Sequence, residues 1–388
     1  MSQIIPPVRI GVVAGEVSGD LLGARLIAEL RRRLPAVQFE GIGGPEMVAL
    51  GCRSLFPMER LSVLGLTEII GRYRELRAIR ARLRRHFLEN PPDLFIGIDS
   101  PGFNLGLELA LRRAGIRTLH YVSPQVWAWR SYRVRKIRRA VSRMLTLFPF
   151  EEQFYQKHDV PVEFVGHPLA DEIPPEVDMR QMRARLKLPQ DRTIVALLPG
   201  SRVSELRAHA DMFVKTALWL QGRHPEMQFI LPFVNRATRQ IFEEAVKRNR
   251  AWDLPITRMH GHSRDALGAA DIALTASGTA TLETLLTRRL MVVTYRMSWL
   301  SYMLIRIFSH IKHYSMPNNL AGRALVPELL QRDAVPEKLG TEIEAQLADP
   351  VHARETLLAF GQIGEQLRRG ASARVADAVL RELGRAPA

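Results

Sequence analysis

The segment DIALTASGTATLETL (residues 271–285) contains a short apolar run, a turn of small residues and a run with helical periodicity, in that order. Residues 272–276 are typical of a buried strand, and residues 277–279 predict a tight turn. From Ala280 onward, leucines recur on one face of a predicted helix. A strand, a tight turn and a helix in succession indicate an α/β fold.

The first turn of this predicted helix can bind an anion. The N–H groups at a helix N-terminus lack partners within the helix and carry the positive end of its dipole. We expect an anion at Ser277, Gly278, Thr279 and Ala280, with Glu283 close enough to accept hydrogen bonds from its hydroxyls. A phosphate joined to a ribose meets both conditions. An ordinary capped crossover helix explains the same residues without a ligand, so both interpretations stay open here.

Length, charge and cysteine content limit the classes of protein. The 388 residues suit two domains. The 55 Lys and Arg residues against 40 Asp and Glu give a formal net charge of +15. This excess predicts anionic partners, namely nucleic acid, acidic lipid or a phosphorylated substrate. The single cysteine, Cys52, excludes an intramolecular disulfide and a metal site built from thiolates, and it fits a reducing cytosol.

No segment of the sequence predicts export or a membrane span. The chain enters its first predicted strand without a basic and then apolar leader, so we expect no secretory signal. The apolar run 290–308 contains Arg296 and Arg306 and is a poor candidate for a bilayer span. A buried strand followed by an amphipathic surface segment explains this run better.

Two successive series of strands and helices are predicted. The first begins with the strand Arg9–Ala14, a glycine loop at 15–20 and a helix at 21–34. The second begins with a strand at 193–198, a turn at 199–202 and a helix at 203–219. The chain therefore predicts two doubly wound lobes that face a cleft.

Asp99 and Arg202 are the first candidates for chemistry. Asp99 follows a predicted strand at 93–98, and the carboxyl ends of parallel strands are where such sheets hold ligands. It is therefore our candidate for a general base, although an aspartate before a helix is also a common N-cap. Arg202 lies in the turn after a strand, where its guanidinium could bind a phosphate through two hydrogen bonds.

Two predicted helices are strongly basic. Residues 72–87 carry seven arginines against one acid, Glu75, and residues 130–143 carry seven cations and no acid. The apolar stripe of the first helix is formed by Leu76, Ile79, Leu83 and Phe87. Solvated helix faces explain these charges, and so does contact with an anionic membrane. Nucleic acid is a further alternative, but no helix-turn-helix, zinc-finger or RNP-type motif occurs.

Five motifs occur in one order along the chain. They are GEVSGD (15–20), SPQVWAW (123–129), GHPL (166–169), LPGSR (198–202) and SGTATLE (277–283). Together they resemble the lipid-A-disaccharide synthase family, whose members are glycosyltransferases of the GT-B type. The resemblance spans residues 9–319. The pattern breaks at GHPL and at Pro174 and Pro175, after which the architecture starts again, so we expect an N-terminal lobe of residues 1–168 and a C-terminal lobe of residues 169–352. We expect C-terminal helices in residues 353–388 to pack back on the first lobe.

The resemblance implies an inverting transfer of 2,3-diacylglucosamine from UDP-diacylglucosamine to 2,3-diacylglucosamine 1-phosphate. The products are the β-1,6-linked disaccharide 1-phosphate and UDP, and no cofactor or metal is used. The absence of any Asp-x-Asp from the chain agrees with the last point. By the same resemblance, Asp99 takes the proton of the acceptor 6-hydroxyl. Arg202 and the N–H groups at 277–280 meet the charge of UDP, and Glu283 holds the ribose diol.

Further residues and partners follow from the same resemblance. Glu16, Ser18 and Asp20 are expected on the acceptor side, with Gly261 and Asn318 on the nucleotide-sugar side. Because both substrates carry acyl chains, the enzyme is expected in the cytoplasm at the inner membrane, bound peripherally and without nucleic acid. A homodimer is one of the oligomeric states left open. The apolar run 63–70 predicts an exposed patch of Leu64, Leu66, Ile69 and Ile70 rimmed by arginines.

Three rival interpretations remain at this point. A lipid-linked muramyl transferase or a UDP-sugar 2-epimerase would share the nucleotide-binding half. A basic nucleic-acid-binding protein would explain the charge alone. The pair His260 and His262 is a separate observation. It is weak evidence for a metal site, because no third ligand is evident.

Overall fold

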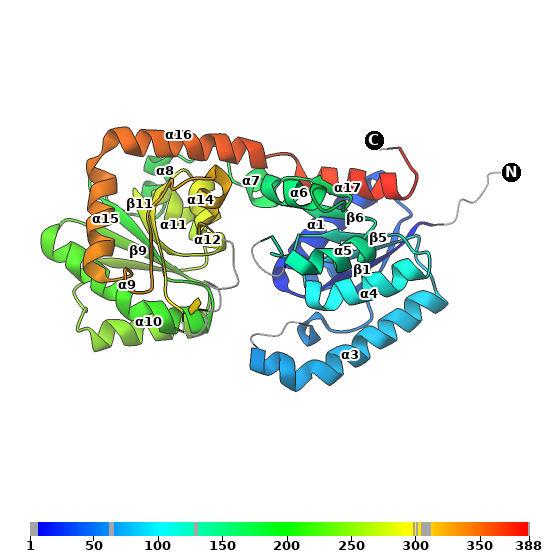
Figure 1. Ribbon diagram of the computed structural model, residues 1–388. Helices are drawn as coiled ribbons and strands as arrows, with labels where there is room; N and C mark the ends of the chain where they lie inside the picture. The colour runs from blue at the N-terminus through cyan, green and yellow to red at the C-terminus, as the bar shows by residue number, and fades with distance from the viewer. Residues whose placement is uncertain are drawn as a thin grey trace. The chain divides into compact units, whose positions relative to one another are not determined.

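The computed structural model describes residues 7–61, 66–127, 131–297, 299, 302–303 and 312–386, without the side chains of residues 66–70 and 131 (Figure 1). It divides into two compact units. Unit 1 consists of Met1–Asp171 with Leu367–Ala388, and unit 2 consists of Glu172–Gln366. Each unit contains one parallel sheet with helices on its faces.

Unit 1 is built on a seven-stranded sheet with the order β3-β2-β1-β4-β5-β6-β7. Its strands are β1 (Arg9–Ala14), β2 (Gln38–Ile42), β3 (Cys52–Ser54), β4 (Leu94–Ile98), β5 (Thr118–Tyr121), β6 (Arg143–Thr146) and β7 (Val162–Phe164). The chain starts at β1, adds strands on one side and then continues from β4 on the other. The carboxyl ends of β1 and β4 therefore flank the switch point at which α/β sheets bind ligands.

The helices of unit 1 include the basic ones. They are α1 (Val17–Arg33), α2 (Pro45–Ala49), α3 (Leu66–Glu89), α4 (Pro101–Arg113), α5 (Val134–Ala140), α6 (Pro149–Gln156), α7 (Pro168–Glu172) and α17 (Ala371–Glu382), with 3-10 turns at Met58–Arg60 and Ser131–Arg133. The helix α4 packs against both α3 and α5, so the two basic helices flank it.

The C-terminal helix α17 packs on α1, which confirms that the end of the chain returns to the first lobe. Arg33 on α1 forms an ion pair with Asp377 on α17. Arg381 binds Glu163 at 2.6 Å and Arg143 binds Glu382 at 3.0 Å. These pairs connect α17 to helix α1 and to the strands β6 and β7.

Unit 2 is built on a six-stranded sheet with the order β10-β9-β8-β11-β12-β13. Its strands are β8 (Ile194–Leu198), β9 (Gln228–Phe233), β10 (Ile256–His260), β11 (Ile272–Ala276), β12 (Leu290–Tyr295) and β13 (Glu328–Leu330). Its helices are α8 (Met179–Arg185), α9 (Val203–Arg223), α10 (Arg236–Arg248), α11 (Ser263–Ala269), α12 (Thr279–Leu286), α14 (Met316–Ala321), α15 (Pro336–Ala348) and α16 (Pro350–Leu367). Here the switch point lies between β8 and β11.

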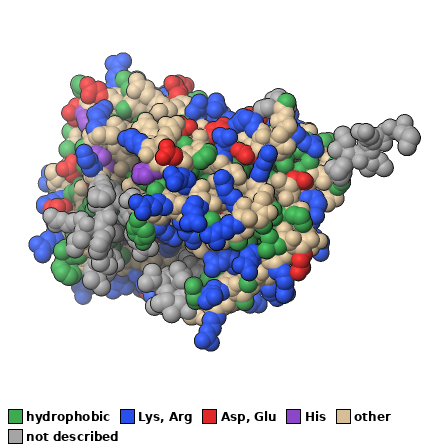
Figure 2. Space-filling view, turned by 45° about the vertical axis from the view of Figure 1, so that its right-hand side comes forward, with side chains coloured by type: hydrophobic (Ala, Val, Ile, Leu, Met, Phe, Trp, Pro, Cys, Tyr) green, Lys and Arg blue, Asp and Glu red, His purple; other side chains and the backbone are tan. Residues whose placement is uncertain are grey.

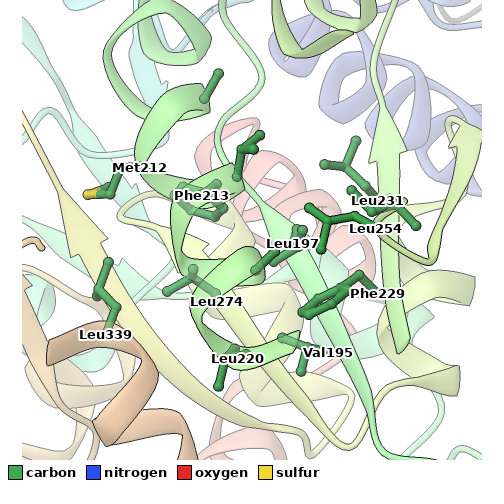
Figure 3. Packing of buried hydrophobic residues seen from close by; sticks show 14 of the residues in the cluster. Val195, Leu197, Met212, Phe213, Leu220, Phe229, Leu231, Leu254, Leu274 and Leu339 are labelled. Atoms are coloured by element: carbon green, nitrogen blue, oxygen red, sulfur yellow. The ribbon is translucent and has the colours of Figure 1, made fainter. Parts of the chain in front are cut away.

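The core of unit 2 fixes helix α9 on the sheet. Met212 and Phe213 of α9 pack with Leu197 of β8 and Phe229 of β9, all of them buried (Figure 3). Apolar burial stabilises such a contact by about 25 cal/mol per Å². The helix α9, which follows the strand β8, is therefore held rigidly on the sheet.

Several elements differ from the sequence-based expectations. The helix α1 begins at Val17, so Gly19 and Asp20 lie in its first turn and are buried rather than in a loop. The strands β3 (Cys-Arg-Ser) and β13 (Glu-Leu-Leu) were not predicted, because each is short and contains a charged residue instead of a continuous apolar run. No helix in the part of the chain that the structure describes is long and apolar enough to span a bilayer.

Candidate active site

The switch point of unit 2 brings two predicted turns to the same edge of the sheet. The strands β8 and β11 are neighbours, and Leu198 pairs with Thr275 near their carboxyl ends. The turn after β8 carries Arg202, and the turn after β11 carries Ser277 and Gly278. Parallel neighbours are about 4.8 Å apart. One diphosphate can therefore contact both turns.

The N-terminus of α12 is open to a ligand. Gly278 has a φ of 140°, which L-residues with a side chain rarely adopt, and both Gly278 and Thr279 are exposed. No side chain caps this helix. Ser277 is occupied, because its N–H donates to Thr294 O at 3.1 Å and its hydroxyl donates to Tyr314 O at 2.7 Å. The available donors are thus the N–H groups of the first turn, including those of Thr279 and Ala280.

Two amides just before α9 are taken by a carboxylate of the helix itself. The carboxylate of Glu205 accepts the N–H of Ser201 at 2.9 Å and the N–H of Arg202 at 3.2 Å. A second anion at these amides would be repelled by Glu205. The Arg202 side chain is 64% exposed and lies 3.7 Å from Glu205. The amides of Ser201 and Arg202 are therefore taken, whereas the guanidinium of Arg202 is available to a phosphate.

Glu283 lies half-buried at the start of α12 and faces the loop after β10. Its Oε2 accepts the hydroxyl of Ser263 at 3.0 Å, whereas its Oε1 has no partner among the described residues. Gly261 in that loop is exposed, has a φ of 65°, and donates its N–H to Phe233 O at 2.7 Å. The structure thus places the loop of Gly261 beside Glu283. Ser263 had no signal in the sequence beyond its place at a helix start.

Asn318 supports a loop instead of lining a site. It is 1% exposed, and its Nδ2 donates to Val326 O at 2.9 Å and to Glu328 Oε1 at 2.7 Å. Its Oδ1 accepts the N–H groups of Leu325 and Val326 at 2.7 and 2.8 Å. Donors and acceptor are all used within the protein. The amide of Asn318 is therefore not free to bind a sugar.

In unit 1, Asp99 lies at the carboxyl end of β4 in a left-handed backbone conformation. Asp99 has a φ of 50° and Ser100 a φ of 44°, and each such residue costs about 1 kcal/mol or more. The N-cap of α4 is Ser100, so the interpretation of Asp99 as a helix cap is wrong. No described group donates to the Asp99 carboxylate. Its oxygens are therefore free to accept a proton.

Asn104 fixes the backbone of the Asp99 turn through hydrogen bonds from its buried side chain. It is fully buried, and its Nδ2 donates to Asp99 O at 2.9 Å and lies 3.2 Å from Val13 O. These carbonyls belong to the ends of the neighbouring strands β4 and β1. The same amide therefore fixes both sides of the switch point. Nothing in the sequence marked Asn104 as a supporting residue, because no other polar residue in its helical turn drew attention to it.

The first turn of α1 lies beside the Asp99 turn. Gly15 packs so closely on Ser100 that an added Cβ would lie 2.2 Å from Ser100 Oγ. Glu16 and Ser18 are exposed at this edge. Asp20 is only 2% exposed, and its carboxylate accepts the N–H groups of Gly44, Glu46 and Met47 at 2.8 to 3.1 Å. Asp20 thus caps α2, and its carboxylate is not available to the acceptor substrate, whereas Glu16 and Ser18 are.

The motif SPQVWAW packs against a buried carboxyl group. The hydroxyls of Ser123 and Tyr155 lie 3.1 Å apart. Burial raises the pKa of Glu151 to about 8, although the N–H of Phe148 donates to its carboxylate. The ring of Trp127 meets Phe150 edge-on at 4.8 Å. Residues 128–130 of this motif lie outside the described residues. The described residues of the motif, 123–127, pack beside the ends of the strands β5 and β6.

The motif GHPL receives the returning C-terminal segment. Gly166 has a φ of 94°, and an added Cβ would lie 2.8 Å from Leu367 O. The N–H of His167 donates to that carbonyl at 2.9 Å, and burial lowers the pKa of His167 to about 4. Asp171 accepts the N–H groups of Gly370 and Ala371 at the start of α17. This motif therefore docks α17 and does not contact the candidate site directly.

The basic helices present their cations to solvent. On α3, Ile79, Leu83 and Phe87 are buried and Leu76 is half-buried, which confirms the predicted stripe. The exposed cations of α3 and α5 are Arg74, Arg77, Arg82, Arg84, Arg85, Arg135, Lys136, Arg138 and Arg139. On the face drawn in Figure 2, Lys and Arg outnumber the acidic side chains. The residues described contain no group of three His, Cys, Asp or Glu arranged for a metal.

Comparison with known proteins gives matches along nearly the whole chain. The family described as LpxB, Lipid-A-disaccharide synthetase, matches residues 10–379. The lipid-A-disaccharide synthase of Azotobacter vinelandii is 52% identical over 373 residues, which are 96% of this chain and 97% of that protein. The one of Methylobacillus flagellatus is 48% identical over 371 residues, 96% of this chain and 98% of that protein.

The fold matches a solved structure with little sequence identity. The UDP-GlcNAc 2-epimerase from Neisseria meningitidis, solved with UDP-GlcNAc, has a TM-score of 0.63 at 12% identity and covers 96% of this chain and 100% of its own. Likeness at this identity concerns the fold alone. With the two parallel sheets, it confirms the expected GT-B type of architecture.

Proposed function

Since this chain belongs to the lipid-A-disaccharide synthase family, we propose that it transfers 2,3-diacylglucosamine from UDP-diacylglucosamine to 2,3-diacylglucosamine 1-phosphate. The chain is a glycosyltransferase of lipid A biosynthesis. The products would be the β-1,6-linked disaccharide 1-phosphate and UDP. Family membership decides against the epimerase, the muramyl transferase and the nucleic-acid-binding protein as alternatives.

The donor is assigned to the switch point of unit 2. The N–H groups of Thr279 and Ala280 and the guanidinium of Arg202 would neutralise the diphosphate from two adjacent strand ends. Glu283 would accept the ribose hydroxyls through its unpartnered Oε1. As the bond from the sugar to UDP breaks, negative charge grows on the leaving phosphate. Donors already fixed in place stabilise that charge without reorganising.

The acceptor is assigned to the switch point of unit 1. Asp99 would take the proton of the acceptor 6-hydroxyl while that oxygen forms a bond to C1 of the donor and the bond from C1 to UDP breaks. Attack from the face opposite UDP inverts C1. Glu16 and Ser18 would contact the acceptor, whereas Asp20 and Asn318 serve the fold around the sites.

One observation carries this assignment. At each switch point the backbone fixes the position of the group expected to bind or react, and the polar atoms of that group have no partner among the residues that the structure describes. In unit 1 it is the Asp99 carboxylate, to which no described residue donates a hydrogen bond, and in unit 2 it is the uncapped start of α12. Elsewhere at these edges the polar groups Asp20 and Glu205 are already occupied.

The substrate assignment can be tested by comparing donors. The purified enzyme should form the disaccharide 1-phosphate from UDP-diacylglucosamine and should form none from UDP-N-acetylglucosamine. The Asp99→Asn variant serves as the control for chemistry on the enzyme. Equal turnover of the two donors would refute the substrate assignment, and turnover in the control equal to that of the wild type would show that the product does not depend on Asp99.

We also infer that the enzyme binds anionic membrane surfaces through α3 and α5. Both substrates carry acyl chains, and each exposed cation near an anionic surface contributes about 1 kcal/mol. Both helices pack on α4 in unit 1. The apolar patch expected at 63–70 stays a prediction, because Leu64 and the side chains of Leu66, Ile69 and Ile70 lie outside the described residues.

Vesicle binding tests this surface. Replacing Arg74, Arg84 and Arg85 with glutamine should weaken binding to vesicles with phosphatidylglycerol at least about tenfold, because three cations are lost. A matched variant in unit 2 carries glutamine at the exposed positions Arg207, Lys247 and Arg250 and should bind normally. Equal losses in both variants would show a general charge effect and remove α3 from the assignment.

A further inference from the structure

His209 is a buried histidine with both ring nitrogens bound to backbone groups. It lies on the second turn of α9 and is 0% exposed. Its Nδ1 lies 2.9 Å from Pro199 O, and its Nε2 accepts the N–H of Arg296 at 3.0 Å. Nε2 also lies 3.2 Å from Arg296 O, but the N–H of Arg296 needs a lone pair on Nε2 and Pro199 O can only accept, so we place the proton on Nδ1. Burial also lowers the pKa of His209, which favours the neutral form.

The two backbone groups belong to strand ends at the donor site. Pro199 follows β8 and opens the turn that leads to Arg202. Arg296 follows β12, at the end of the strand on the other side of β11. The ring of His209 therefore connects the ends of the two strands that flank β11, the strand that leads into α12. Tyr295 packs edge-on against this ring, with the centroids 5.0 Å apart.

The helix α9 holds the Arg202 turn at two levels. Near the surface, Glu205 accepts the N–H groups of Ser201 and Arg202. One helical turn further in, His209 donates to the carbonyl at the start of the same turn. Helix α9 is itself seated by Met212 and Phe213 on the sheet (Figure 3). The packing of α9 in the core of unit 2 therefore determines the position of the Arg202 turn.

We propose that His209 is a positioning residue for the donor diphosphate, which sets the Arg202 turn against the N-terminus of α12. This proposal rests on the proposed role of Arg202. A residue without ring nitrogens would leave Pro199 O and the N–H of Arg296 buried without partners, and the turn would shift to find new ones. A shifted turn moves the guanidinium away from the diphosphate.

The first test measures UDP affinity by calorimetry together with thermal unfolding. His209→Phe keeps an aromatic ring but removes both nitrogens, and we expect UDP affinity to fall about tenfold or more. His209→Gln keeps one donor and one acceptor, and we expect most of the affinity to return. Thr216→Val is the matched control on α9, because Thr216 is buried but binds only Met212 O within the helix. It should leave UDP affinity unchanged.

The second test is a double-mutant cycle with Arg202→Ala. If His209 acts through the turn, the double variant should bind UDP no more weakly than Arg202→Ala alone. Losses that add would overturn the proposal and show a general effect on unit 2. If Arg202→Ala alone leaves UDP affinity unchanged, the proposed donor site itself is wrong. Should His209→Phe fail to fold, His209→Asn goes through the same cycle with the same expectation.

Discussion

Replacing Asp99 with asparagine should remove catalysis and little else. Asparagine tolerates the left-handed φ of 50° as well as aspartate does. The carboxylate receives no hydrogen bond from the described residues, so no folded-state interaction is lost. We therefore expect the free energy of unfolding to change by about 0.5 kcal/mol or less. Loss of a general base should slow turnover by about 10² to 10⁴, or about 2.7 to 5.4 kcal/mol in the barrier.

The assay follows disaccharide formation in single-turnover mode, with UDP affinity measured in parallel. Affinity for UDP should persist, because the diphosphate is assigned to unit 2. Asp99→Ala is the companion variant, since alanine lacks the tolerance for left-handed backbone and should lose about 1 kcal/mol of stability as well as activity. Turnover that survives in Asp99→Asn, or a collapse of its UDP affinity or stability, would refute the role of Asp99 as base.

Three further predictions concern residues that support the site. Asp20→Ala should lower the free energy of unfolding by about 3 kcal/mol, measured by urea titration, because the two buried N–H groups of Gly44 and Met47 and the part-buried one of Glu46 lose their acceptor. Gly166→Ala should expose α17 to amide hydrogen exchange, because its Cβ would collide with Leu367 O. Glu151 has a pKa raised from 4.5 to about 8, so its contribution to stability is present below pH 4.5 and is lost as the pH rises through 8. The thermal midpoint of Glu151→Gln should fall less than that of the wild type between pH 5 and pH 9.

The strands could be predicted because buried parallel strands are continuous apolar runs. The bounds of β1 and β11 agree with the expected residues for this reason. The direction of a polar side chain has no comparable signal. Asp20 shares a motif with Glu16 and Ser18, yet its position in the first turn of α1 points its carboxylate at α2. Asn318 likewise stands in a polar loop but bonds only inward.

The supporting residues were missed for a related reason. Asn104 binds Val13 O, 91 residues away, and His209 binds the backbone of Arg296, 87 residues away. Their partners are backbone groups, which every residue carries, so no pair of residue types in the sequence marks the contact. Only the order of the strands in each sheet brings these groups together.

The two helix N-termini at the switch point of unit 2 explain how one diphosphate could find one position. Both α9 and α12 begin at neighbouring strand ends, and two open N-termini would offer a phosphate two competing amide sites. Glu205 takes the two amides just before the first of them, those of Ser201 and Arg202, and places a negative charge there. This charge favours the amides of α12 and the guanidinium of Arg202 as the contacts of the diphosphate. Glu205, although it binds no substrate, would thus restrict the donor to one orientation. In that orientation the bond between the sugar and the diphosphate breaks next to the amides of α12.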